Sequence, residues 1–361
     1  MVRRVLKSGL AGGLRWSGAS LLRRTVSGRS GSPWVVGYHR VVEDFTRSAR
    51  TSIPAMLISR AMLERHLDWI GRRFDFVSLD EIAASHEGGR RFRRPAAAVT
   101  FDDGYHDVYE MAFPLLKAKG IPAAIFVVTD LIGTAQIPLF DRLHLALLRA
   151  REGGPSPPAR LARIIPALGL EVARLRHPSA GAEDPLRLTR LLLEALARED
   201  LERAVGALEG EVGVDEAMMR ERRPLSWDML RDMRRSGITI GSHTRGHALL
   251  TLENEERVLE ETVGSRRVLE ERLGAPALHF AYPNGWFDAR TIATVRRAGY
   301  RSASTSCRHR DPAHPLLTLP RTILWENSSL GMFGRFSPAV LGCQADGTFD
   351  RPGSCPQIHW N

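Results

Sequence analysis

Residues 96–105 of the chain read Ala-Ala-Ala-Val-Thr-Phe-Asp-Asp-Gly-Tyr, and this stretch decides the fold. An apolar run of strand length leads directly into two carboxylates, Asp102 and Asp103, and then into Gly104. Adjacent acids repel each other, so the pair is tolerable if a cation neutralises one of them, and a glycine lets the chain turn sharply past the site. The stretch therefore predicts a strand that ends in a functional loop, with a solvent-exposed Asp-Asp-Gly turn as the competing interpretation.

Outward from this stretch, the same order recurs along the chain: a short apolar run, then a residue capable of chemistry. The five further runs are residues 35–38 before His39, 121–128 before Thr129 and Asp130, 238–241 before His243, 278–282 before Pro283 and Asn284, and 318–320 before Arg321.

Helical spacing fills the intervals between these runs. The apolar residues at helical intervals, and the glycines that follow them, are Leu63, Leu67 and Ile70, then Leu259, Val263, Leu269 and Leu273 before Gly274, and finally Gly299. Alternating strands and helices are typical of a parallel α/β fold, and in a parallel barrel the reactive groups gather at the carboxyl ends of the strands. We therefore expect a barrel-like α/β domain with its Asp and His residues at one end.

Residues 135–223 break this rhythm, because they are rich in Leu, Ala, Arg and Glu. We interpret them as a helical insertion with solvated helix faces. The expected organisation is a basic leader over residues 1–32, one large domain over residues 33–325 that contains the insertion, and a C-terminal tail over residues 326–361.

The formal net charge of +10 is concentrated near the N-terminus. Residues 1–31 hold seven Lys and Arg residues and no acid, which leaves +3 for the rest of the chain, so we expect no nucleic-acid partner. A basic segment with Leu and Trp at near-helical spacing favours peripheral contact with an anionic membrane surface, and a floppy leader is the alternative. Gly and Arg interrupt every apolar run there, so no signal peptide is recognisable. The expected location is cytoplasmic or peripheral at the inner face of the membrane.

A second motif is His-Thr-Arg-Gly-His at residues 243–247, where two imidazoles four residues apart are expected to share one face of a helical turn. That is a metal-ligand spacing, although a chain with 12 histidines can show it by accident. Two imidazoles and one carboxylate make a three-ligand site with open positions, as in catalytic zinc sites. Such a cation lowers the pKa of bound water from about 15.7 towards about 7, and the remaining carboxylate could take the water's proton.

These residues carry a resemblance to a known family. Thr-Phe-Asp-Asp-Gly at 100–104, His243-Thr244-x-x-His247 and Phe-Ala-Tyr-Pro-Asn-Gly at 280–285 resemble the three motifs of the polysaccharide deacetylases of carbohydrate esterase family four, the NodB homology group. The resemblance covers roughly residues 33–133 and 224–325. It implies a distorted (β/α) barrel of the NodB type, carrying a helical insertion, and a hydrolase that removes N-acetyl groups from amino sugars of a polysaccharide or saccharide precursor.

The resemblance also assigns roles to individual residues. It implies that Asp102 is the catalytic base, and that Asp103, His243 and His247 hold a divalent metal cation, with zinc the first choice. The backbone N–H of Asn284 would complete an oxyanion hole for the tetrahedral intermediate. Tyr282 and Trp286 are candidates to line the sugar groove, and a position in the core is the alternative for both.

Two departures from the family pattern need an explanation. Ala281 stands where many members carry an arginine that orients the catalytic aspartate, and Arg321 is our candidate to replace it, with a surface salt bridge as the alternative. The family's C-terminal Leu-x-His motif, which supplies the general acid, is absent. Gly-Tyr-His at 37–39 resembles the branch that deacetylates poly-N-acetylglucosamine, where the acid histidine follows the first strand, so His39 is predicted to be the acid rather than a structural histidine.

Other functions stay open at this level. Relatives of this fold cleave O-acetyl esters and small cyclic amides, so an O-acetyl esterase or a cyclic amide hydrolase on the same site is one alternative. A non-catalytic carbohydrate-binding or membrane-surface protein that retains the fold is the other.

Overall fold

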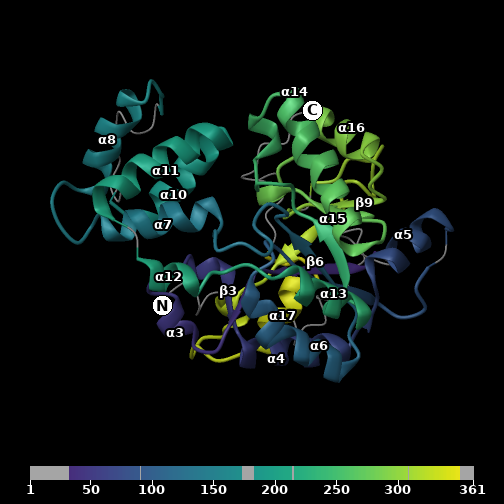
Figure 1. Cartoon of the computed structure of the whole chain (residues 1–361). Helices are drawn as coiled ribbons and strands as arrows, with labels where there is room; N and C mark the ends of the chain where they lie inside the picture. The colour runs from purple at the N-terminus through teal and green to yellow at the C-terminus, as the bar shows by residue number, and fades with distance from the viewer. Residues whose placement is uncertain (1–31, 90, 173–182, 214, 308, 350–361) are drawn as a thin grey trace.

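The computed structural model describes residues 32–89, 91–172, 183–213, 215–307 and 309–349, and at its centre lies a parallel β-sheet (Figure 1). The predicted basic leader and the end of the predicted tail lie outside these residues. Seven strands follow one another in the order β10, β1, β5, β6, β7, β8 and β9, while β4 pairs with β5. Their bounds are β1 Trp34–Tyr38, β4 Asp75–Phe76, β5 Ala96–Phe101, β6 Ala123–Val127, β7 Thr239–Ser242, β8 His279–Ala281, β9 Ser302–Ser304 and β10 Arg321–Ile323.

The two edges of this sheet almost meet. Ser304 of β9 forms a parallel bridge with Leu319, two residues before β10 begins. The N–H of Thr305 donates to the Leu319 carbonyl at 3.0 Å, and the N–H of Leu319 donates to the Ala303 carbonyl at 2.8 Å. The nearly closed parallel sheet, with helices around it, confirms the predicted (β/α) barrel of the deacetylase type.

Alternation along β5 explains how the decisive stretch builds the barrel. Ala96 and Ala98 belong to a core cluster with alternate residues of β1, β6 and β8, whereas Val99 and Phe101 pack in the cluster that includes helices α4 and α6. Side chains two residues apart in a strand share a face, so the face of Ala96 and Ala98 continues to Asp102. The small alanines fit the narrow space between facing strands, and the same face ends in a carboxylate.

Helices connect and surround the strands. The helical segments outside residues 135–223 are α3 Phe45–Ser48, η1 Pro54–Met56, α4 Arg60–Gly71, α5 Leu79–Glu87, η2 Val108–Ala112, α6 Phe113–Lys119, α13 Trp227–Arg235, η3 Leu250–Leu252, α14 Glu255–Leu259, η4 Glu260–Gly264, α15 Ser265–Leu273, η5 Pro283–Gly285, α16 Ala289–Arg297, η6 Glu326–Ser329 and α17 Pro338–Ala345. A separate two-stranded parallel sheet joins β2 Arg40–Val42 to β3 Leu57–Ser59.

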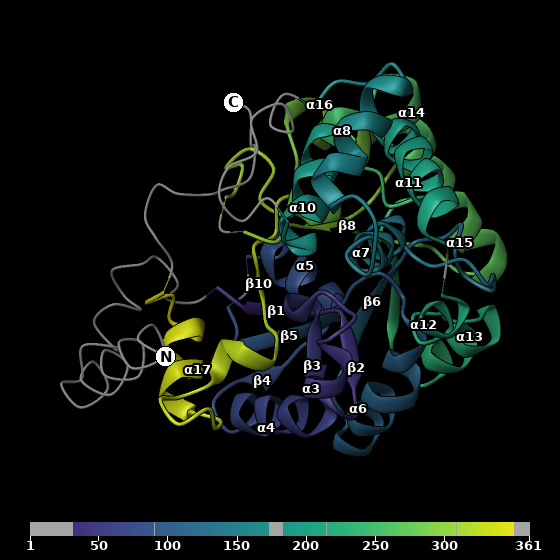
Figure 2. The same cartoon turned by 90° about the vertical axis from the view of Figure 1, so that its left-hand side faces the viewer.

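A helical lobe stands beside the barrel. It comprises α7 Leu139–Arg149, α8 Pro157–Ala167, α10 Pro185–Ala195, α11 Arg198–Val212 and the short α12 Glu216–Arg220. The first four pack around their own buried leucines and isoleucines, and they form a group to the left of the strands in Figure 1 and above β2 and β3 in Figure 2. The described residues of 135–223 are thus mainly helical, and the limits of the predicted insertion stay a prediction.

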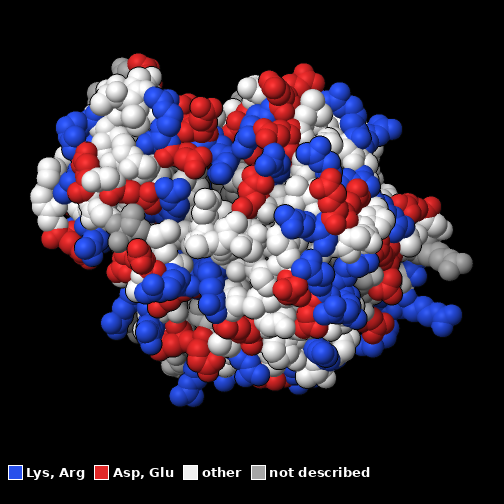
Figure 3. Space-filling model, viewed as in Figure 1, with Lys and Arg blue, Asp and Glu red and all other residues white. Residues whose placement is uncertain are grey.

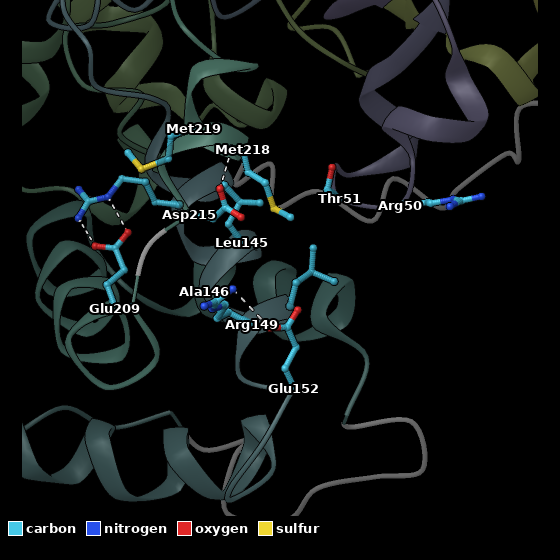
Figure 4. A pocket seen from close by; sticks show the side chains of 13 residues that line it. Arg50, Thr51, Leu145, Ala146, Arg149, Glu152, Glu209, Asp215, Met218 and Met219 are labelled. Carbon is cyan, nitrogen blue, oxygen red and sulfur yellow. Dashed lines mark hydrogen bonds and ion pairs between the residues drawn. The ribbon is translucent and has the colours of Figure 1, made fainter.

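Buried polar contacts join the lobe to the barrel. The Tyr105 hydroxyl, two residues after Asp103, donates to the Asp141 carboxylate of α7 at 2.6 Å, and both side chains are buried. A second pocket lies at this junction, between α7, α11, α12 and the segment at Thr51 (Figure 4). Several of its charged groups are already engaged, since Arg142 pairs with Glu209 at 2.5 Å and Asp215 caps α12. These polar contacts within the protein stabilise the junction between lobe and barrel.

Two details differ from the sequence prediction. Arg321 was expected to follow the last strand, but it begins β10, because Pro320 has no N–H to donate to a strand ladder. Val263 was expected on the buried stripe of a regular helix, but it is exposed, because residues 260–264 form a π-helical turn that rotates the face.

Figure 3 shows Lys and Arg side chains interspersed with Asp and Glu over one face of the molecule, around a centre of uncharged residues. Within the described part of the chain, no helix combines the length and the apolar character needed to cross a bilayer.

Candidate active site

The carboxyl ends of β1, β5, β7 and β8 open into one pocket. Six of the predicted site residues line it, together with residues of the helical lobe that are described below; the six are His39, Asp102, Asp103, His243, His247 and Asn284. Parallel strands bring residues together at one end of the barrel even when 200 residues separate them in the chain. The structure therefore assembles most of the predicted site.

The three predicted metal ligands converge. One ligand atom each of Asp103, His243 and His247 lies within 4.8 Å of the other two. Asp103 Oδ1 is 3.5 Å from His243 Nε2 and 3.4 Å from His247 Nε2, longer than an ordinary hydrogen bond. Neither carboxylate oxygen of Asp103 has a hydrogen-bond partner among the described residues, although both are buried. Burial raises the pKa of Asp103 well above its usual range, and the neighbouring Asp102 raises it further.

A buried carboxylate without partners, facing two imidazole nitrogens, is the donor set of a cation site. His243 is already oriented for that role, since its Nδ1–H donates to the Ala281 carbonyl at 2.7 Å and leaves Nε2 turned towards Asp103. Burial lowers the pKa values of His243 and His247, which keeps both imidazoles neutral as metal binding requires. The residues present therefore fit a divalent cation.

The loop that carries the two histidines is not a helical turn, and that expectation was wrong. Residues 243–249 are irregular, and Thr244 and His247 have left-handed φ values of 68° and 62°. The conformation is held by buried contacts, because the His247 N–H donates to Thr244 Oγ1 at 2.8 Å and the Gly246 N–H donates to the Glu261 carboxylate at 2.7 Å. The rings converge through this strained loop.

Backbone strain is confined to the site. Among the described residues, the non-glycine residues with left-handed φ are Asp103, Thr244, His247 and Asn284, with values between 54° and 69°. Such residues cost about 1–3 kcal/mol each and persist only where the surroundings impose them. At Asp103 the left-handed turn redirects a side chain that would otherwise point away from the barrel interior, and Gly104, with a φ of 73°, continues the turn as predicted.

Asp102 is held by a buried arginine. Arg321 donates from Nη1 to Oδ1 and from Nη2 to Oδ2, both at 2.7 Å, and neither side chain is more than 3% exposed. Burial alone raises the pKa of Asp102, but the Arg321 guanidinium and the nearby His243 outweigh it and bring the value to about 2. Arg321 thus occupies the place expected of the missing family arginine and is not a surface salt bridge.

Gly37 of β1 lies beside this contact. Arg321 lies on β10 and Asp102 follows β5, so the guanidinium reaches across β1, which runs between those strands. A Cβ atom on Gly37 would lie 2.5 Å from Ile323 Cδ1 and 3.7 Å from Arg321 Nη1. The guanidinium therefore passes Gly37 at van der Waals distance, and the missing side chain leaves room for Ile323.

His39 lies beside the same carboxylate. Its Nε2 is 3.9 Å from Asp102 Oδ2, and its Nδ1 has no hydrogen-bond partner within the described residues. Burial lowers the pKa of His39 to about 4, although the Asp102 charge opposes this shift. A pKa this low keeps the imidazole neutral at pH 7, and without a partner at Nδ1 among the described residues the ring lacks the hydrogen bond expected of a structural histidine.

Of the remaining predicted residues, two line the pocket and one does not. Asn284 and Trp286 line the pocket, Asn284 with a φ of 54°. Tyr282 does not line it, because its side chain is fully buried against Phe280 and Phe287 in a separate aromatic core. For Tyr282 the structure shows the alternative position in the core, since it packs in a different cluster from its neighbour Ala281.

Sequence reasoning missed the contribution of the helical lobe. The Phe140 ring of α7 packs against the His247 ring, with 5.0 Å between centroids, and residues of α10 line the pocket. It also missed Glu261, because a buried glutamate within a charged helical stretch is indistinguishable from its exposed neighbours in the sequence. The helix faces of the insertion were expected to be solvated, whereas one face of α10 lines the pocket.

Comparison with known proteins agrees with this geometry. The family model described as polysaccharide deacetylase matches residues 89–165 and 183–303, more than half of the chain. The chain belongs to the polysaccharide deacetylase family. Membership confirms the resemblance and the enzyme class predicted from the motifs.

Curated members of this family match over short stretches. The chain is 33% identical over 69 residues to the poly-beta-1,6-N-acetyl-D-glucosamine N-deacetylase of Escherichia coli K12, which is 19% of this chain and 10% of that protein. It is 27% identical over 113 residues to the enzyme of the same name from Staphylococcus aureus, which is 29% of this chain and 39% of that protein. The matches thus span well under half of these relatives.

Solved structures of deacetylases are similar in fold over a larger part of the chain. The Streptococcus pyogenes deacetylase PplD, in complex with acetate, superposes with a TM-score of 0.54 at 16% identity, covering 87% of this chain and 97% of that one. IcaB from Ammonifex degensii gives a TM-score of 0.54 at 19% identity, covering 88% and 97%. The deacetylase fold therefore includes most of this chain.

Proposed function

We propose that this protein is a metal-dependent N-deacetylase that removes acetyl groups from amino sugars of a polysaccharide or saccharide precursor. The observation that carries the proposal is the convergence of Asp103, His243 and His247 beside a second, separately held carboxylate, Asp102. Family membership supports the reaction class. The N-acetylated glycan follows from that class and from the names of the relatives.

Asp103, His243 and His247 would hold the cation, for which zinc is our first candidate because two imidazoles and a carboxylate leave positions open. A bound divalent cation would polarise the acetamido carbonyl and acidify water. The remaining steps belong to side chains and backbone of the chain itself.

Asp102 is suited to accept the proton of the attacking water. The Arg321 guanidinium holds the pKa of this carboxylate at about 2, so it is ionised and able to accept at neutral pH. The bidentate contact also fixes the orientation of the carboxylate while leaving it lone pairs for the water. Asp102 is thus the proposed base and Arg321 its positioning residue.

His39 is the proposed acid for the departing sugar nitrogen. Because its pKa is about 4, the imidazole has to receive its proton within the cycle. Asp102 Oδ2 lies 3.9 Å from His39 Nε2, too far for a direct hydrogen bond in the free protein. In the proposed cycle the two groups come within hydrogen-bond reach when substrate binds, and the proton taken from water passes to His39 and then to the nitrogen as the C–N bond breaks. Water and amide are thereby converted to acetate and amine with no other reactant.

Asn284 is proposed to stabilise the oxyanion through its backbone N–H. Its left-handed conformation at the pocket wall supports the proposal, since main-chain donors in tight turns commonly serve this purpose. Peripheral membrane contact through the basic leader remains a separate proposal.

The test is acetate release from N-acetylated oligosaccharides by the zinc-loaded protein. The Asp102→Asn variant should lose roughly 10²- to 10⁴-fold in kcat/KM while still binding zinc, because it removes the base and keeps the three ligands. Full activity in this variant with the metal bound would contradict the assignment of the base.

A matched comparison separates amide from ester hydrolysis. An O-acetyl ester has a better leaving group and needs less help from an acid, so His39→Ala should reduce N-deacetylation much more than ester cleavage. Activity on esters alone in the unaltered protein would instead favour the O-acetyl esterase.

A further inference from the structure

One wall of the pocket comes from helix α10 of the lobe and not from the barrel. Five residues at the spacing of a single helix face line the pocket, and they are Leu186, Thr189, Arg190, Leu193 and Glu194. A different face carries Leu188 and Leu192, which are buried in the core of the lobe. The pocket face of α10 thus carries two leucines, of which Leu193 also packs against the cores of the barrel and the lobe, whereas Leu186 belongs to neither core.

Leu186 is the clearest sign that the second face has another use. It is 38% exposed, one of few large apolar side chains in the described chain with that exposure. Such a residue inside a concave site, rather than on a convex surface, favours contact with a ligand.

The barrel contributes matching aliphatic groups. Ile53 and Met56 before β3, and Ile323 of β10, line the same pocket as Leu186 and Leu193. A sugar ring has hydroxyl groups around its rim, and burying them against aliphatic side chains that cannot hydrogen-bond is unfavourable. An acetyl group offers only one methyl, which is too small to cover apolar residues from three segments of the chain.

The polar residues of the same helix face do not select a charged sugar. Arg190 and Glu194 pair with each other at 2.6 Å, so this part of the wall carries no net charge. The remaining character of the wall is aliphatic, and it is continuous with the site of Asp102 and Asp103.

We infer that α10 is a substrate-selecting wall and that the pocket accepts an N-acetylated amino sugar bearing an alkyl or acyl chain, a glycolipid in preference to a bare sugar polymer. The inference rests on the proposed deacetylase function. In it, the chain of the substrate lies along Leu186 and Leu193 while the acetamido group meets the site at the strand ends.

The test compares two substrates that differ only in the apolar group, methyl and octyl N-acetyl-β-D-glucosaminide, below the micelle concentration of the octyl compound. Acetate release by the full-length zinc-loaded protein should give a kcat/KM about tenfold or more higher for the octyl glycoside, because several methylene groups leave water. A ratio near one would overturn the inference and leave the deacetylase function standing.

Leu186→Asp should bring the octyl-to-methyl ratio close to one, since it puts a charge on the proposed wall. The matched control is Val263→Asp, which changes an equally exposed apolar side chain outside the pocket and should keep the ratio. An unchanged ratio in Leu186→Asp would also overturn the inference.

Calorimetric measurement of binding of the same two glycosides tests the α10 wall separately from the deacetylase function. If neither compound is deacetylated, the proposed function fails, and tighter binding of the octyl glycoside that Leu186→Asp abolishes would still support the wall. Equal binding of both glycosides would overturn it.

Discussion

The two sides of the pocket are built in different ways. On the barrel side, polar groups come from loops at strand ends, and Asp103 and His247 have left-handed conformations, which at His247 a hydrogen bond to Thr244 supports. On the lobe side, a regular helix presents Leu186 and Leu193 without backbone strain. The difference teaches that a loop holding reactive groups needs many surrounding contacts to fix its backbone. A helix face that selects the substrate can change one side chain at a time without disturbing the backbone.

The same contrast exists between the ion pairs of the two sides. Arg321 and Asp102 are both buried and form a bidentate pair, whereas Arg190 of α10 is largely exposed and pairs with Glu194 one turn away. Truncating one partner of a buried pair leaves an uncompensated charge, and an exposed helical pair contributes little.

The largest expected effect follows from this contrast. Arg321→Ala should lower the free energy of unfolding by about 3–5 kcal/mol, and Arg190→Ala should change it by less than about 0.5 kcal/mol. Urea unfolding followed by circular dichroism measures both variants. Equal losses would remove the distinction between the two sides.

The second prediction concerns Glu261, whose carboxylate accepts from the Gly246 N–H between the two histidine ligands. Glu261→Ala should weaken zinc binding about 10- to 100-fold, as loss of groups that orient metal ligands does. Competition with a chromophoric chelator measures it. Glu261→Gln keeps an acceptor oxygen and should restore most of the affinity.

Glu260→Ala is the control, because Glu260 is exposed and pairs with the Arg245 and Arg257 side chains at the surface, and not with the backbone of the histidine loop. It should leave zinc affinity unchanged. A loss as large in Glu260→Ala as in Glu261→Ala would indicate a general effect of charge and would contradict the positioning role.

The last prediction concerns an effect that is small per unit of pH, and it compares a buried histidine in each region. His66 packs in the barrel with hydrogen bonds to Tyr38 and Ser329, and burial lowers its pKa to about 3. Burial also lowers the pKa of His144 in the lobe, but Asp141 opposes that shift. Both histidines are therefore neutral in the folded state, and protonating either of them would destabilise the fold. At His66 no nearby acid of the described residues offsets the effect of burial, as Asp141 does at His144.

A folded pKa below the unfolded value of about 6.5 means that this stability is complete above pH 6.5 and is lost as the pH falls towards the folded pKa. For His66 the loss should be about 1.4 kcal/mol per pH unit between pH 6.5 and pH 3. His66→Gln should reduce the dependence of the unfolding free energy on pH below pH 6.5. His144→Gln should reduce this pH dependence by a smaller amount. Equal slopes in the two variants would show that Asp141 does not matter.

The sequence allowed the barrel and its ligands to be predicted, because both depend on local order along the chain. Asp102, Asp103, His243 and His247 each follow a short apolar run, and parallel strands then bring such positions together. The prediction for Arg321 rested on its place at the last strand, and the missing family arginine supplied the reason to look for it.

What could not be predicted depends on contacts across the fold. The polar strand β9, Ser-Ala-Ser, has no apolar run to reveal it. The burial of Tyr282 depends on neighbours brought up by other elements, and the turn around His247 depends on Glu261 and on the strand pairs beside it. The contribution of α10 required knowing where the lobe packs.

The passage of Arg321 past Gly37 has a consequence for biosynthesis. The ribosome delivers Asp102 more than 200 residues before it delivers Arg321, so the nascent chain carries an unneutralised acid at the position that will become the barrel interior. Burying that acid early would be unfavourable, and the guanidinium arrives on the strand that completes the ring. Closure of the sheet and neutralisation of the acid are therefore one event, which has to wait until residue 321 has been synthesised.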